Sequence, residues 1–518
     1  MNAPYALHPH QARSELSVEY PIGSRSADRF RWTFQLLAVP FLAVVLRAAS
    51  PPTSALSYLV IAGYAFAGRR QAIIALFLVW LFNMMNHDIG GPPLYAATLR
   101  HVVVLAAAMS VVIHGVSRNA VTKRAGIMWA TAAMLGLMLL HSLAISRAPD
   151  LSILKIIMFA TAILASLGGW GGMDEDERRT TAQMIFGGLI LLSLASLVIL
   201  VAFPGRAYYR GTATLFKGAL QHSQSLGPML AFLAAALTIQ CLTVRPLRLW
   251  RIVVLLISLY LMIRTSARIS LVAYLGGIVA GFGYAMASSL VVRYRLHPQI
   301  VGTRLVVATL LMMVMLAAFG GRIASLAREF IAKAAIEDGE DVSLVEAGMK
   351  SRGAVMESLM INIRRNPLLG VGFGVPSDPA DMGSIGRDPI LGLAVIAPVE
   401  KGVLPLAVIE EFGIPMATII FLWIAMLILL STRGGMLTVT VLAACLLSNI
   451  AEAAFFSPGG FGMLELVFTG WAVMAPVGGR DRQQRDQRRA AEARSFERPL
   501  PPLHSLPVQQ HIGHALPH

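Results

Sequence analysis

Hydrophobic residues run in long blocks along most of the chain, and short polar segments separate the blocks. Each block holds about 15 to 22 residues, enough to cross a hydrocarbon core of roughly 30 Å as an α-helix. Lipid offers the backbone no hydrogen bonds, so membrane-spanning segments are helices or closed barrel strands. The blocks lack the alternation of barrel strands, which have a length of about ten residues. The pattern therefore predicts an all-α, polytopic transmembrane helix bundle.

The blocks predict about fourteen helices, of which about 12–14 are expected to span the membrane. The 54–68 block is short, and the 405–431 block is long enough to hold an approach segment followed by a span. The predicted ranges are 32–49, 54–68, 71–87, 98–117, 125–146, 151–170, 182–203, 226–244, 249–263, 269–291, 302–319, 405–431, 436–454 and 461–477.

Composition supports this class. Of the 518 residues, 56% are hydrophobic and only 14% are charged, whereas a soluble domain carries about 25% charged residues. The net charge of +15 would suggest nucleic acid in a soluble protein. In a membrane protein the same excess is typical of cytoplasmic loops, so no nucleic-acid partner is expected. The two cysteines, Cys241 and Cys445, fall in apolar blocks and are interpreted as core residues.

The distribution of basic residues predicts the orientation. They gather on alternate loops, together with the polar segments 1–31 and 478–518, and the positive-inside rule assigns that side to the cytoplasm. The 478–518 segment has the composition of a disordered tail. The bundle, 32–319 and 405–477, then presents two long external loops, 204–225 and 320–404, and the second is expected to contain short helices. The basic residues on the cytoplasmic side include Arg69, Arg70, Arg118, Lys123, Arg124, Arg178, Arg179, Arg245, Arg248, Arg251, Arg293, Arg295 and Arg433.

Basic residues on the external side are informative because the positive-inside bias acts against them. Guanidinium groups bind phosphate oxygens through two parallel hydrogen bonds, so three external clusters predict a phosphate-bearing ligand. A single such residue is better explained by a side chain that reaches lipid headgroups. The predicted pyrophosphate-binding residues are Arg206, Arg210 and Lys217 in the first loop, Arg264 and Arg268 at a short turn, and Arg364 and Arg365 in the long loop.

The most unusual polar segment is NIRRNPLLGVGFG, residues 362–374. A helix is expected upstream, from a capping-box pattern at 343–346, and it should stop at Asn366 because Pro367 disfavours helix in the preceding residue. Gly370, Gly372 and Gly374 allow positive φ and close backbone approach. The segment lacks the features of a phosphate-binding P-loop and of a Rossmann turn, so a nucleotide is not expected.

Four segments resemble motifs of the superfamily that contains O-antigen ligases and O-antigen or exopolysaccharide polymerases. Residues 352–374 are similar to the element that ends in n-P-l-x-G-x-G-x-G. KGALQHSQSLG, residues 217–227, resembles G-x-x-x-H-x-N-x-x-G through Gly218, His222 and Gly227, with Gln224 in place of Asn. The two other segments are RTSARISLVAYLGG, which places Arg268 in the family's arginine position with Ala267 where Ser is usual, and PLAVIEEFGIPMATIIF, which matches E-x-G through Glu411 and Gly413 but lacks the second glycine.

The resemblance implies a metal-independent glycosyltransferase without a cofactor, in the inner membrane of a bacterium. Its substrate would be an oligosaccharide on undecaprenyl pyrophosphate, and its acceptor a growing glycan or a glycolipid, with membrane lipid and a chain-length regulator as further candidate partners. Many ligases carry a His-Asn pair before the E-x-G segment. Here Glu400 and Lys401 stand in that neighbourhood, which favours a polymerase over a lipid A ligase.

The chemistry that this implies can be matched to residues. A pyrophosphate leaving group needs nearby positive charge, and an acceptor hydroxyl needs a base within hydrogen-bond reach. The candidate catalytic residues are His222, Glu400 and Glu411, with Glu410 as a further carboxylate beside Glu411. For His222 a purely structural role is an equal alternative, and one of the two adjacent glutamates is expected to be structural.

Two other classes of protein remain open on the sequence. A flippase or transporter of lipid-linked sugars would carry ionisable residues within its spans, and Lys155, Glu452 and Glu465 do fall in apolar blocks. The long external loop is less expected of that class. A non-catalytic subunit of a polysaccharide complex is the third reading, and such a subunit should tolerate loss of Arg268.

Overall fold

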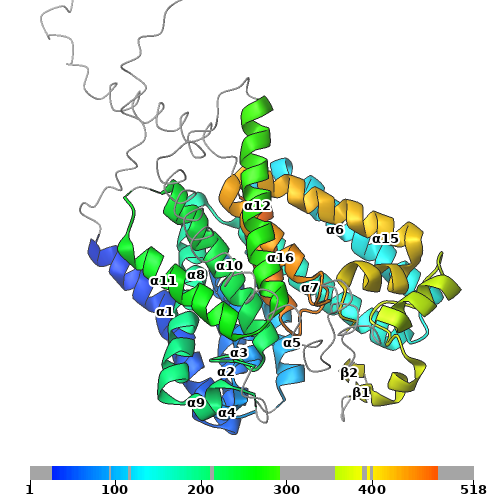
Figure 1. The fold of residues 1–518 in the computed structure, drawn as a ribbon, viewed down its shortest axis with the longest axis horizontal. Coiled ribbons are helices and arrows are strands. Elements are labelled where there is room, and N and C mark those ends of the chain that lie inside the picture. The colour runs from blue at the N-terminus through cyan, green and yellow to red at the C-terminus, as the bar shows by residue number, and fades with distance from the viewer. Residues whose placement is uncertain are drawn as a thin grey trace, which may run out of the picture. The chain divides into compact units, whose positions relative to one another are not determined.

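A computed structural model describes residues 26–92, 95–114, 118–209, 215–244, 246–291, 356–387, 394–396 and 401–475. Helices dominate these ranges (Figure 1), which confirms the all-α class. Within them, the strands are limited to β1 (Gly386–Arg387) and β2 (Ala394–Ile396), which pair antiparallel in the long loop. The predictions for Arg210, Glu400, the 302–319 block, the 343–346 capping box and the 478–518 segment lie outside the described residues.

Each predicted block that the structure describes contains a helix, although the 436–454 block extends beyond its helix, which ends at Ser448. Four short helical turns lie between the main helices: α4 (His87–Gly90), α9 (Pro204–Ala207), η2 (Pro379–Ser384) and η3 (Thr432–Gly434). The main helices are α1 (Ser26–Ala49), α2 (Pro51–Ala65), α3 (Arg69–Met84), α5 (Ala96–Ile113), α6 (Arg118–Ile145), α7 (Pro149–Gly172), α8 (Glu175–Ala202), α10 (Ser223–Thr243), α11 (Leu249–Arg264), α12 (Arg268–Val291), α15 (Leu404–Ser431), α16 (Met436–Ser448) and α17 (Gly462–Val473).

Six stretches of helix in the described residues are long and apolar enough to cross a membrane. They are Gly126–Ile145, Pro149–Gly172, Glu175–Ala202, Ser223–Thr243, Arg268–Ser288 and Leu404–Gly434. The chain is therefore a multi-pass membrane protein. Four shorter apolar helices accompany these six, and the total of about 12–14 spans stays a prediction.

Helix ends follow local sequence signals. Asp174 caps α8 by accepting the backbone N–H of Glu177 at 2.8 Å, and the Glu177 carboxylate accepts the Asp174 N–H in return. This reciprocal capping box satisfies two backbone donors that the first turn of a helix leaves without partners. Ser50 caps α2 in the same way with Thr53. The polar breaks between the apolar blocks therefore also start the next helix.

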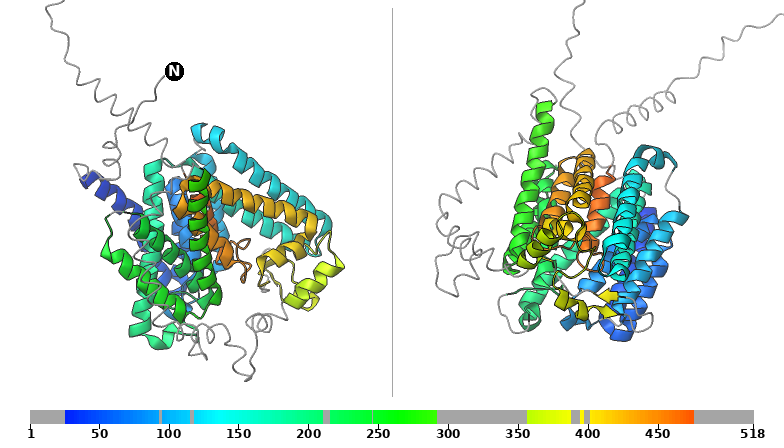
Figure 2. Two further views of the ribbon diagram at one scale, coloured as in Figure 1. Left: turned by 45° about the horizontal axis from the view of Figure 1, so that its top comes forward. Right: turned by 90° about the vertical axis from the view of Figure 1, so that its right-hand side faces the viewer.

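Small residues let neighbouring helices approach closely. Helix α12 lies against α16 and α10 (Figure 1 and Figure 2). A Cβ added at Gly277 of α12 would lie 2.8 Å from the Thr440 carbonyl oxygen of α16, so only glycine fits there. Close contact between small residues is the usual basis of helix packing in lipid, where hydrophobic burial does not favour association between helices.

Helix α15 is not continuous. Gly413 has φ 69° and ψ 167°, which breaks the helix before Pro415. The second part packs against α6, where the Trp423 indole donates a hydrogen bond to the Thr131 hydroxyl at 3.0 Å. The break divides the 405–431 block into a short approach helix and a long apolar helix. This break shapes the site described below.

Connecting segments that are far apart in sequence meet at one end of the bundle. Met85, just after α3, forms an isolated β-bridge with Leu220, just before α10. The Arg147 amide donates to the Val371 carbonyl at 3.2 Å, and the Leu404 amide donates to the Asn449 carbonyl at 3.0 Å. These are the segments that the pattern of basic loops assigns to a common side.

Candidate functional site

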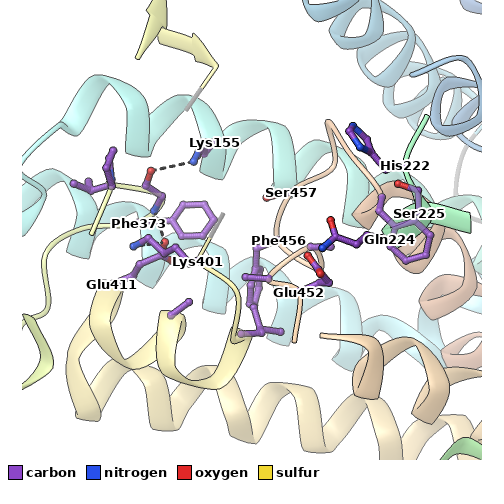
Figure 3. Close-up of a pocket in the computed structure, with 18 of the residues that line it drawn as sticks. Lys155, His222, Gln224, Ser225, Phe373, Lys401, Glu411, Glu452, Phe456 and Ser457 are labelled. Atoms are coloured by element: carbon purple, nitrogen blue, oxygen red, sulfur yellow. Dashed lines mark hydrogen bonds and ion pairs between the residues drawn. The ribbon is translucent and has the colours of Figure 1, made fainter. Parts of the chain in front are cut away.

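A cavity of about 370 Å³ lies where these connecting segments meet (Figure 3). Helix α7 contributes Lys155. The start of α10 contributes its N-cap residue, His222, and two residues of its first turn, Gln224 and Ser225. The rest of the lining comes from Met84 at the end of α3, the Gly-rich segment, Lys401 with the beginning of α15, and the connection between α16 and α17. In Figure 3, Lys155, Lys401 and Glu411 stand at one end, and His222, Gln224 and Glu452 stand at the other.

The first end is built on a buried group of charges. The Lys401 ammonium pairs with the carboxylates of Glu410 at 2.8 Å and of Glu411 at 3.0 Å. Glu410 is fully buried, and it also accepts hydrogen bonds from the Asn362 amide at 2.7 Å and from the Ser377 hydroxyl at 3.0 Å. Buried carboxylates are tolerated when they are paired and hydrogen-bonded in this way. Glu410 is therefore a structural residue that joins α15 to the long loop.

Charge balance stabilises Lys401 in its charged form. Burial alone would lower the pKa of Lys401, but the carboxylates of Glu411 and Glu410 outweigh burial and hold its pKa above the ordinary value of 10.5. Lys401 is thus charged at neutral pH.

Glu411 faces the cavity but is held from two sides. Its Oε1 atom accepts the backbone N–H of Gly374 at 2.9 Å in addition to the contact with Lys401. The Lys155 ammonium donates to the Gly374 carbonyl at 3.0 Å. Lys155, Gly374, Glu411 and Lys401 therefore form one connected wall (Figure 3).

The Gly-rich segment is docked on the broken helix through its backbone. The amides of Val371 and Gly372 donate to the carbonyls of Glu410 and Glu411 at 2.9 Å each, and the Ile414 amide donates to the Pro367 carbonyl at 2.8 Å. Neither the Gly-rich segment nor α15 at Gly413 is a regular helix, so both leave backbone N–H and carbonyl groups free of intrahelical hydrogen bonds. The segment therefore continues the hydrogen bonding of α15 where α15 itself is interrupted.

The three glycines of this segment have the positive φ that the sequence predicts, 71° at Gly370, 109° at Gly372 and 66° at Gly374. Residues 356–365 are helical, and the helix ends before Asn366 as expected. A Cβ at Gly374 would lie 2.3 Å from the Lys155 side chain. The glycines thus shape the wall of the cavity.

The second end of the cavity centres on His222. Its ring stacks on Tyr209 with 5.6 Å between centroids, and its Nδ1 atom lies 3.3 Å from the Tyr209 hydroxyl. Ser225 donates a weak hydrogen bond to the Met84 sulfur at 3.3 Å. Glu452 reaches this end from the connection between α16 and α17. The second end therefore combines an imidazole, an amide, a hydroxyl and a carboxylate.

The predicted basic residues that the structure describes, a set without Arg210, are not gathered around the cavity. Arg206, Arg264, Arg364 and Arg365 are exposed, Arg268 is half-buried at the start of α12, and none of them lines the cavity. Lys217 is buried and pairs with Asp88, which suits a structural role. Arg264 hydrogen-bonds Tyr208, with its guanidinium 5.8 Å from the ring centroid.

His222 and Glu411, predicted as catalytic, do line the same cavity. Lys155, Lys401 and Glu452 also line the cavity, but they were not predicted as site residues from the sequence. An ionisable residue inside an apolar block was the available signal for Lys155 and Glu452. Within the described residues, no group of three or more His, Cys, Asp or Glu residues is placed to hold a metal ion.

Comparison of the sequence with known protein families and with curated proteins finds no match. The functional argument for this chain therefore rests on the cavity and its chemistry.

Proposed function

We propose that the chain is a membrane glycosyltransferase of the O-antigen ligase and polymerase type. It would transfer or polymerise oligosaccharide repeats carried on undecaprenyl pyrophosphate, at the outer face of the bacterial inner membrane, with both termini in the cytoplasm. The observation that carries this proposal is a convergence of three motif-like segments on one cavity. KGALQHSQSLG contributes His222, NPLLGVGFG contributes Phe373 and Gly374, and PLAVIEEFG contributes Glu411.

The fourth segment, RTSARISL, is packed against the same region. A Cβ at Gly227 of α10 would lie 2.3 Å from the Ser270 hydroxyl and 2.8 Å from the Ala267 side chain. Arg268 thus starts a helix that touches the segment beginning with His222. Arg264 contacts Tyr208, whose neighbour Tyr209 stacks on His222. Arg264 is therefore linked to the His222 end of the cavity through the two tyrosines, and we assign Arg268 of the same turn to that end.

This arrangement supports a defined chemistry. The cations near the His222 end would stabilise the negative charge of the departing pyrophosphate. The acceptor hydroxyl would attack the anomeric carbon from the opposite side and invert its configuration. Lys401, which stands near the position of the ligase His-Asn pair, is fully engaged with Glu410 and Glu411. This favours a glycan polymerase over a lipid A ligase.

The proposed function is tested by deleting the gene and analysing the cell's glycans. We expect single lipid-linked repeats to accumulate on the outer face of the membrane and the ladder of long chains to disappear. Long chains that remain on the carrier would indicate a ligase instead. Repeats trapped on the inner face would indicate a flippase. A normal glycan profile would contradict every one of these activities.

Arg268→Ala is expected to reduce glycan transfer by at least about 100-fold, the usual effect of removing one group that stabilises developing negative charge. The protein level should stay normal because Arg268 is half-buried at a helix start. Complementation of the deletion strain measures both quantities. The exposed Arg433 offers a matched control, since Arg433→Ala should restore the ladder fully. A full ladder with Arg268→Ala would remove this residue from the site.

Two of the ionisable residues that favoured a transporter, Lys155 and Glu465, have structural contacts. Lys155 donates to the Gly374 carbonyl, and the Glu465 carboxylate accepts hydrogen bonds from Ser448 at 2.7 Å and Asn449 at 2.9 Å. Both residues belong to networks that fix connecting segments. Glu465 is in addition fully buried and does not line the cavity, whereas ionisable residues of a transport pathway face an aqueous route through the bundle.

A further inference from the structure

The wall built around Glu411 makes this residue a poor partner for a reacting hydroxyl. Its Oε1 atom already accepts from Gly374 and contacts Lys401. Uptake of a proton there would weaken the attraction to a buried lysine and leave that charge poorly compensated. Glu411 is thus suited to holding the Gly-rich segment in place, and the other carboxylate that lines the cavity among the described residues, Glu452, lies at the opposite end.

Glu452 lies at that other end, on the segment 449–461 between α16 and α17. The segment is braced at its start by Asn449. The Asn449 side-chain oxygen accepts the amides of Ala454 at 2.9 Å and Phe455 at 2.7 Å, and its Nδ2 atom donates to both carboxylate oxygens of Glu465 at 2.9 Å. Asn449 and Glu465 are both buried. A buried carboxylate is costly, and here its contacts fix the loop that carries Glu452.

The far side of the same segment is also fixed. The Arg100 guanidinium donates to the Gly459 carbonyl at 3.0 Å, and the Asn83 amide lies 3.4 Å from the same oxygen. Asn83 in turn accepts the Tyr58 hydroxyl at 2.7 Å. The loop is therefore anchored on both sides of Glu452. Catalytic groups benefit from such anchoring because their orientation is set before the substrate binds.

His222 shares this end of the cavity but is held differently. One face of its ring stacks on Tyr209, and Nδ1 lies next to the Tyr209 hydroxyl. These contacts orient the imidazole on Tyr209, whose neighbour Tyr208 contacts Arg264, and suit a role in positioning the donor. Glu452 is the carboxylate that lies across from it (Figure 3).

We propose that Glu452 is the general base of the transfer reaction, an inference that rests on the proposed function. Its carboxylate takes the proton of the acceptor sugar hydroxyl. The hydroxyl oxygen then forms a bond to the anomeric carbon of the donor, and the bond from that carbon to the pyrophosphate oxygen breaks. The electron pair leaves with the polyprenyl pyrophosphate, so the step needs no oxidant, reductant or further reactant.

The test uses the full-length protein in lipid nanodiscs and lipid-linked glycan extracted from the deletion strain. Glu452→Gln is expected to lower kcat by at least about 100-fold, the usual contribution of a general base. KM for the lipid-linked glycan should change by less than about threefold, since the amide keeps the shape of the side chain. Glu452→Asp, which keeps a carboxylate, should retain more activity than Glu452→Gln.

The matched control is Glu357→Gln, the same change of charge on an exposed residue outside the cavity, which should leave kcat unchanged. Glu452→Ser serves if the glutamine variant is not recovered folded, and the same loss of kcat is expected. A folded Glu452→Gln or Glu452→Ser variant within about threefold of the wild-type kcat would overturn the assignment while leaving the glycosyltransferase intact. A wild-type protein that is inactive on this substrate would instead contradict the proposed function itself.

Discussion

Replacing Lys401 with methionine is expected to destabilise the protein by about 3–5 kcal/mol, the usual cost of removing one partner from a buried ion pair. The side chains of Lys401, Glu410 and Glu411 are 6%, 0% and 8% exposed, so water cannot take over the role of the lysine. Two carboxylates would be left buried next to each other without a cation. The apparent Tm of the purified protein and its yield in monodisperse form measure the loss.

A multiple variant separates this electrostatic cost from a loss of packing. Neutralising the two carboxylates as well, in Lys401→Met with Glu410→Gln and Glu411→Gln, should recover much of the lost stability because no buried charge remains. The exposed Arg433 supplies the control, since Arg433→Met should leave Tm unchanged. If Lys401→Met alone were as stable as the wild type, the three charges would not form the cluster described above.

The pH dependence of the stability that Lys401 contributes follows from the direction in which its pKa is shifted. A lysine whose pKa is raised in the folded state contributes stability below its unfolded pKa and loses it as pH rises through the folded pKa. Because the pKa of Lys401 is raised above its ordinary value, the contribution of this lysine is fully present at neutral pH and is lost as pH rises through the raised pKa in alkaline solution. Stability comparisons between the wild type and Lys401→Met at neutral pH therefore report the full effect.

Much of the fold could be predicted from the sequence because the signals were local. An apolar block of about 20 residues allows little besides a helix in lipid, so blocks such as 151–170 and 226–244 recur as α7 and α10. The end of the 356–365 helix also followed from one residue, Pro367. The end of the 436–454 block was predicted wrongly. Helix α16 ends at Ser448, and Asn449 with the SPGG turn at 457–460 was the available signal.

The site was harder to predict because it depends on how deeply each side chain is buried and on contacts between segments that are distant in sequence. Counting arginines on one side of a membrane predicts sidedness, but it does not distinguish Arg264, which is exposed against Tyr208, from a residue that lines the cavity. Lys401 and Glu410 are nine residues apart, and their pairing depends on how the segment before α15 folds back. Glu452 was assigned to a span, whereas it lies on the connection between α16 and α17. The contact of Arg264 and the pairing of Lys401 with Glu410 are set by tertiary packing and leave no local pattern, whereas the position of Glu452 could have been inferred from the turn that follows it.

The second large effect is expected at Gly413, where the break in α15 receives the Gly-rich segment. A Cβ at this position would lie 2.2 Å from the Leu368 carbonyl oxygen and 2.7 Å from the Leu369 amide nitrogen. Both atoms belong to the backbone, so no side chain can move aside. Gly370 is in the reciprocal position, since its Cβ would meet the Glu411 carbonyl oxygen at 2.5 Å. The two glycines therefore permit the backbone contact that holds the segment to the helix.

Gly413→Ala is expected to cost roughly 3 kcal/mol or more, from left-handed backbone strain, overpacking and weakened hydrogen bonds. Gly435 provides a control for the strain alone, because its φ is 85° and nothing lies within 4 Å of an added Cβ. Gly435→Ala should therefore cost only about 1–2 kcal/mol. Apparent Tm values of the two variants give the comparison, and glycan transfer by Gly413→Ala should fall because Phe373 and Gly374 form part of the cavity wall. Equal Tm values for the two variants would mean that the segment does not dock on the broken helix, because the steric difference between the two positions arises only from that contact.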